Sequence, residues 1–128
     1  MTSKFTDPEH FMAVAARHLT KVQESWDPPD WSELSTYGLY CLEALVRAAV
    51  LKVQQVPSTQ HWKKAKEAEM LHKSHGLPDI SDMMSDLNSA RKANAYGDAE
   101  FVEGEHDAED VANRIEEYFK SVRNLLDK

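Results

Sequence analysis

The segment that decides the fold is Tyr37–Leu51, which reads YGLYCLEALVRAAVL. Apolar residues surround nearly the whole circumference of a helix drawn through it, and they continue to Leu34 on one side and Val53 on the other. A helix that is apolar nearly all round is buried on several sides. We therefore expect a central helix over about residues 31–55, with other helices packed on most of its faces.

The composition of the whole chain also favours a helical protein. Its 128 residues are 41% hydrophobic, which is enough for one domain with a single core, but they include only 4 glycines and 5 prolines. So few turn residues are typical of helices and not of a many-turned β-sandwich. We predict an all-α fold, a single-domain up-and-down bundle of about five helices that spans residues 1–128.

Capping residues and apolar spacing place the other helices. Asp7 followed by Pro8 is typical of a helix start, and Asp30 with Glu33 three residues later starts the central helix like a capping box. Gly76 suits the position after a helix end, and Asp107 precedes the clearest amphipathic pattern in the chain. Either Asp79 or Ser81 starts the fourth helix. The predicted helices cover about 8–23, 31–55, 59–75, 80–96 and 108–126.

The negative charge is concentrated in one short segment. Seven of the 22 acidic residues lie between Asp98 and Asp110, where there is no Lys or Arg, and the other 15 equal the 15 basic residues in number. The net charge of -7 therefore belongs to this segment, which argues against indiscriminate polyanion binding by the whole surface. A solvated or partner-facing loop and a divalent-cation site both fit it, and the lack of EF-hand spacing favours the loop.

The single cysteine and the charge pattern bear on the compartment. Cys41 has no partner for an intramolecular disulfide, so we expect a cytoplasmic protein. The most apolar stretch is interrupted by Glu43, Arg47 and Lys52, and the first residues lack the apolar region of a signal peptide. We therefore expect no association with a membrane.

Histidine and lysine residues gather in the predicted third helix. His61, His72 and His75 lie on roughly one face, and two histidines three residues apart can share a metal ion. No Cys pair or His-Glu-x-x-His spacing accompanies them, so we favour structural roles and expect no metal and no cofactor. Lys63, Lys64, Lys66 and Lys73 beside Trp62 fit either a phosphate-binding patch with a stacking ring, or solvated lysines around a core tryptophan.

The most informative polar stretch is LNSARKANAYGD at residues 87–98. It places Arg91 near the end of the predicted fourth helix, with Tyr96 five residues further on. An arginine fork matches phosphate oxygens, and a side chain one to two turns away can act on the same group. The structural alternative is an ion pair from Arg91 to Asp86 or to Asp98.

These residues, in this order of helices, resemble the HEPN domains, small all-α bundles of bacterial and archaeal toxin-antitoxin and defence systems. The resemblance covers most of the chain. It includes the opening Tyr37–Leu45 of a long buried helix, a His-containing third helix, the Leu-Asn-x-x-Arg segment at 87–91, and a final amphipathic helix at 108–126. It implies a dimer whose interface holds a metal-independent ribonuclease site, built from an Arg and a His a few residues later.

Arg91 matches the arginine of that site, whereas Tyr96 stands where the histidine is usual. A phenol with an unperturbed pKa of ~10 is a poor general base near neutral pH, so the resemblance leaves the enzymatic activity open. It implies Arg91 and Tyr96 as candidate catalytic residues. The candidate substrate-binding residues around them are Asn88, Lys92, Asn94 and Asp98.

Two functional hypotheses follow. The first is an RNA-directed protein of a prokaryotic toxin-antitoxin or defence system, a metal-independent endoribonuclease with a divergent Arg/Tyr site. The second is a non-catalytic interaction module that binds a partner protein, such as an antitoxin, a nucleotidyltransferase or a defence effector. In both cases we expect a homodimer, on the resemblance and because Met83 and Met84 lie on the same helix as Arg91, where adaptable side chains suit an interface.

Overall fold

The structure is a computed structural model that describes the backbone of residues 7–53, 61–95 and 107–128. It also describes the side chains of these residues, except 61–62 and 93–95. The described part of the chain forms helices and no strand, which confirms the predicted all-α bundle. The five helices are α1 (Pro8–Ser25), α2 (Trp31–Lys52), α3 (His61–His75), α4 (Ser81–Ala95) and α5 (Ala108–Leu126).

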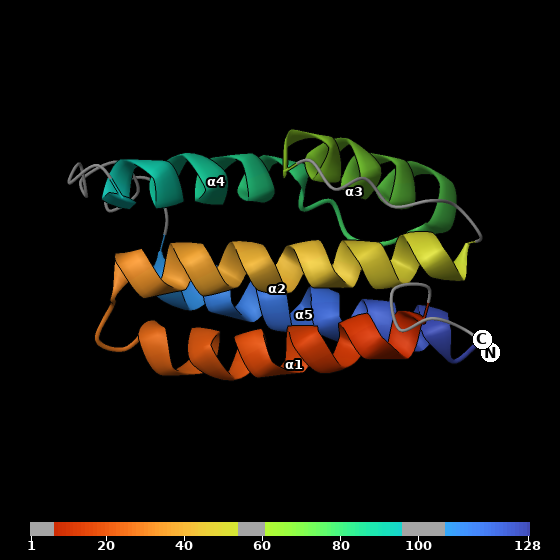
Figure 1. The fold of residues 1–128 in the computed structure, drawn as a ribbon, viewed down its shortest axis with the longest axis horizontal. Helices are drawn as coiled ribbons and strands as arrows, with labels where there is room; N and C mark the ends of the chain where they lie inside the picture. Colours follow the sequence, from red (N-terminus) through yellow and green to blue (C-terminus); the bar gives the residue numbers. More distant parts are fainter. Residues whose placement is uncertain (1–6, 54–60, 96–106) are drawn as a thin grey trace.

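Helix α2 is the centre of the bundle, as predicted. Helices α1 and α5 pack along one side of α2, while α3 and α4 follow each other along the opposite side (Figure 1). Helices α1, α2, α4 and α5 alternate in direction, whereas α3 runs the same way as α2 (Figure 1). The chain returns from the end of α3 through residues 76–80, and Leu77 and Ile80 of this segment are buried. Helices α3 and α4 therefore form one layer over α2.

Each of the three long helices begins at an aspartate N-cap, as the sequence predicts. The Asp7 and Asp107 carboxylates accept the backbone N–H two residues later at 3.0 Å, and Asp30 accepts that of Glu33 at 3.1 Å. The reciprocal half of a capping box does not form, because Glu33 Oε2 instead accepts the hydroxyl of Ser25 at 3.2 Å. Glu33 thus joins the end of α1 to the start of α2.

Most helix ends fall within a few residues of their predicted positions. Helix α1 continues two residues further than expected, to Ser25, whose single hydroxyl proton is shared between Glu33 and the closer Lys21 carbonyl oxygen at 2.6 Å. Helix α2 ends at Lys52, and residues 54–60 lie outside the described part. Gly76 has a φ of 73°, as expected after a helix end, and Asp79 accepts the N–H of Ser81 at 3.1 Å.

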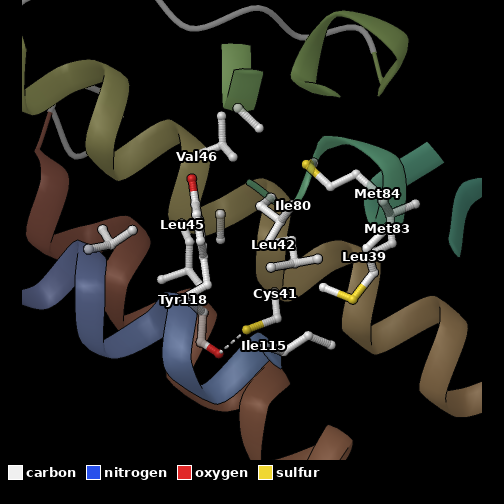
Figure 2. Packing of buried hydrophobic residues seen from close by; sticks show 14 of the residues in the cluster. Leu39, Cys41, Leu42, Leu45, Val46, Ile80, Met83, Met84, Ile115 and Tyr118 are labelled. Atoms are coloured by element: carbon white, nitrogen blue, oxygen red, sulfur yellow. Dashed lines mark hydrogen bonds between the residues drawn. The ribbon is translucent and has the colours of Figure 1, made fainter. Parts of the chain in front are cut away.

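The core surrounds α2 and contains buried residues of all five helices, and Figure 2 shows the part of it that holds the labelled residues of α2, α4 and α5. Gly38 allows the closest approach, since a Cβ there would lie 3.0 Å from Ile115 Cδ1 of α5. Met83 and Met84 are only 1% and 2% exposed, so they belong to this core. These methionines therefore offer no surface for a dimer, and the expected homodimer rests on the resemblance alone.

Helix α2 is long and apolar enough, by length and composition, to cross a membrane. In the bundle, 67% of the most apolar 18-residue stretch of α2 is buried. The core helix of a globular bundle passes the same test, so this feature is weak support for a membrane span.

Candidate functional site

Arg91 lies on α4, one position after a residue that faces the core. Leu87 and Ala90 are buried at 1% and 0% exposure, and Arg91 beside them is half-buried. Its Nη2 donates to Asn88 Oδ1 at 3.0 Å, across one turn of the helix. Its Nε is buried and has no hydrogen-bond partner. One bond from Asn88 therefore positions the guanidinium group.

The guanidinium of Arg91 has no counter-ion among the described residues. The sequence left an ion pair with Asp86 or Asp98 open; no pair with Asp86 forms, and Asp98 lies outside the described part. A guanidinium carries five N–H donors and stays protonated in proteins. An unsatisfied buried donor costs about 1–3 kcal/mol. The guanidinium group is therefore held in place while several of its N–H donors have no partner. Such donors suit a phosphate or carboxylate oxygen.

The structure brings together only part of the predicted site. Asn88 is half-buried and bonded to Arg91, and Lys92 is exposed next to it. The side chain of Asn94, and Tyr96 and Asp98 as a whole, lie outside the described part of the chain. The described site is therefore an arginine, its positioning amide and one neighbouring lysine.

Among the described side chains of α3, His72 and His75 form no recognisable metal site. Within the described residues no group of three or more His, Cys, Asp or Glu side chains could hold a metal ion. His72 Nδ1 instead lies 2.7 Å from the carbonyl oxygen of Leu77. This hydrogen bond fixes the segment that returns from α3 towards α4, which is a structural role. The side chain of His61 is not described, and the same holds for the acidic segment before Asp107.

The lysines of α3 do not form the uniform basic patch that the sequence allowed. Lys63 and Lys66 are exposed, and Lys73 pairs with Glu69 at 2.7 Å. The side chain of Lys64, in contrast, is only 1% exposed. Its Nζ lies 3.4 Å from Glu67. Burial lowers the pKa of Lys64, and the neighbouring Glu67 opposes that shift. Lys64 is therefore turned into the bundle and is not a surface contact for phosphate.

A group of aromatic rings between α1 and α2 was not predicted from the sequence. The ring centroid of His18 lies 5.9 Å from that of Tyr37 and 5.8 Å from that of Tyr40. Burial lowers the pKa of His18, and the nearby charge of Arg17 adds to this. Further along the same two helices, Arg47 Cζ lies 5.6 Å from the centroid of the Phe11 ring.

A pocket of about 180 Å³ adjoins these rings. Its walls come from one turn of α1 and two turns of α2: Phe11, Val14, Tyr40, Glu43, Ala44 and Arg47. The available sequence signal was the pair Glu43 and Arg47, two charges at helical spacing inside an otherwise apolar helix. In the sequence alone, these two residues look like interruptions of a hydrophobic stretch.

The chain matches no family model, no curated protein and no solved structure.

Proposed function

We propose that this protein is directed to RNA and contacts its phosphate backbone through Arg91, as a homodimer of the HEPN type in a prokaryotic toxin-antitoxin or defence system. The observation that carries the proposal is the state of Arg91, which Asn88 holds in place and no described carboxylate neutralises. An arginine with an unused fork is the side chain best suited to a phosphate group. The exposed Lys92 beside it adds a second positive charge.

Local contacts of this kind agree with the charge of the chain. Outside residues 98–110 the acidic and basic residues are equal in number, so no general excess of positive charge attracts RNA, and binding must depend on a few well-placed cations. Arg91 would then also stabilise the negative charge that develops when a phosphodiester is cleaved. Acid-base catalysis would fall to Tyr96, five residues later in the chain.

The test is a titration of fluorescently labelled single-stranded RNA in EDTA, followed by anisotropy and by gel analysis of cleavage. Arg91→Gln should weaken binding by about tenfold or more, since a hydrogen bond to a charged group contributes ~1.5–3 kcal/mol. Arg17→Gln is the matched control, because Arg17 is an exposed arginine on α1 away from this site. It should leave the affinity nearly unchanged.

Two further variants separate binding from catalysis. Tyr96→Phe should keep most of the binding and lose any cleavage, and Tyr96→His should create or raise metal-independent cleavage with a pH dependence set by imidazole. Light scattering should give twice the chain mass of 14.6 kDa. If no variant binds or cleaves RNA, the proposal fails and the non-catalytic interaction module is adopted in its place.

A further inference from the structure

A second candidate site lies between α1 and α2, on elements that Arg91 does not belong to. The pocket there has a volume of about 180 Å³. The pocket is partly open to solvent and is larger than the space that a single water molecule needs. A small organic molecule fits in this space.

Arg47 is the charged group of this pocket with hydrogen-bonding capacity left over. Its guanidinium stacks on the Phe11 ring at 5.6 Å, which orients the fork without using its donors. Within the described part of the chain, no hydrogen bond or ion pair joins Arg47 to a carboxylate. The neighbouring Lys64 is matched by Glu67 at 3.4 Å, and the acidic residue that lines the pocket together with Arg47 is Glu43.

The other walls restrict the anion that Arg47 can accept. Phe11, Val14 and Ala44 supply apolar surface, so the ligand needs an apolar body as well as a charge. Glu43 lies one helical turn from Arg47 and also lines the pocket. Its carboxylate repels a second negative charge on the ligand, which favours a monoanion over a phosphate dianion.

We propose that this pocket binds a small free monocarboxylic acid with an apolar, ring-sized body. The carboxylate pairs with the fork of Arg47, and the body packs on Phe11, Val14 and Ala44 beside the Tyr40 ring. This binding is independent of RNA contact at Arg91, because the two sites share no residue.

Amide chemical shifts of the ¹⁵N-labelled protein, followed during titration, test the proposal. Benzoate is the probe, and benzamide and phenyl phosphate are matched compounds with no charge and with two charges. Benzoate should give saturable shifts at residues of the pocket, while the other two should bind at least about tenfold more weakly. Equal binding of benzamide, or tighter binding of phenyl phosphate, overturns the proposal.

Variants assign the binding to Arg47. Arg47→Met keeps a long side chain against Phe11 and should lose benzoate binding by about tenfold or more, whereas Arg47→Lys should retain part of it. Arg17→Met on α1 is the control and should bind like the wild type. Unchanged binding by Arg47→Met contradicts the proposal, provided that its helical circular dichroism matches the wild type. If Arg47→Met loses its fold, weaker benzoate binding by the folded Arg47→Lys supports the role of the guanidinium, and unchanged binding contradicts it.

A peptide arm tests whether the ligand is a free acid. A short peptide that ends in phenylalanine also carries a carboxylate, but it adds polar peptide groups that the side chains of Phe11, Val14 and Ala44 cannot hydrogen-bond. It should bind more weakly than benzoate. Tighter binding of the peptide would overturn the assignment to a free acid.

Discussion

The three long helices α1, α2 and α5 are stabilised differently from the layer formed by α3 and α4. The long helices have 18, 22 and 19 residues, and each starts at an aspartate that caps it. Arg123 of α5 also bonds both carboxylate oxygens of Glu9 on α1. Helices α3 and α4 have 15 residues each, and their sequences are less clearly amphipathic.

The α3–α4 layer also holds polar groups that do not help it to fold. Lys64 is buried with a single long contact to Glu67, and the Nε of Arg91 is buried without a partner. Burying such groups costs free energy. From this difference we expect the long helices to carry most of the stability, while the layer over α2 holds Arg91, for which we propose the RNA contact.

The largest effects should separate the two regions through core truncations. Leu45 of α2 and Leu71 of α3 are both fully buried. Leu45→Ala and Leu71→Ala should each cost about 2–5 kcal/mol, with Leu45→Ala the larger, because α2 has packed helices on more sides. Urea unfolding measures both. An equal or larger loss for Leu71→Ala would show that the layer contributes as much as the centre.

A smaller effect should come from the Lys64–Glu67 pair. Glu67→Gln leaves a buried ammonium with less compensation and should destabilise the protein by about 1–3 kcal/mol. Lys64→Met removes the buried charge and keeps the volume, so its unfolding free energy should stay within about 1 kcal/mol of the wild type. If Lys64→Met lowered the unfolding free energy more than Glu67→Gln does, the buried Lys64 would stabilise the fold, which contradicts this prediction.

The smallest effect should come from the ion pair between α1 and α5. Hydrogen bonding from Arg123 lowers the pKa of Glu9, so the stabilisation is complete above the ordinary value of 4.5 and is lost as the pH falls through the lowered pKa. Both side chains are solvent-accessible, and Glu9→Gln should therefore cost less than about 1 kcal/mol at pH 7. The difference in melting temperature from the wild type should shrink below pH 4.5. A constant difference across that range would exclude the ion pair as its cause.

The structural features that the sequence predicted well depend on local signals. The caps at Asp7, Asp30 and Asp107, the turn at Gly76 and the central position of α2 follow from residue types and spacing within a few turns. Such features need no knowledge of how the helices pack.

The sequence could not predict what depends on contacts between helices. The burial of Lys64 and the pocket at Arg47 follow from how α3 and α1 pack against α2, and no spacing within one helix reveals this. Met83 and Met84 face inward, as their helical spacing with Leu87 predicts, but they do not indicate a dimer surface, because a flexible apolar side chain suits a core as well as an interface. At the candidate site, the sequence found Arg91 but left its partner open, and the structure supplies Asn88.

The most direct test of this account is the free energy of unfolding of Arg91→Gln, measured by urea titration against the wild type. Our central claim is that Arg91 binds a ligand and contributes little to the stability of the fold. Its guanidinium makes one hydrogen bond and buries an unsatisfied Nε, so the substitution should change the unfolding free energy by no more than about 0.5 kcal/mol. A loss of about 2 kcal/mol or more, as for truncation of a core residue, would show that Arg91 is a structural residue and would contradict the account.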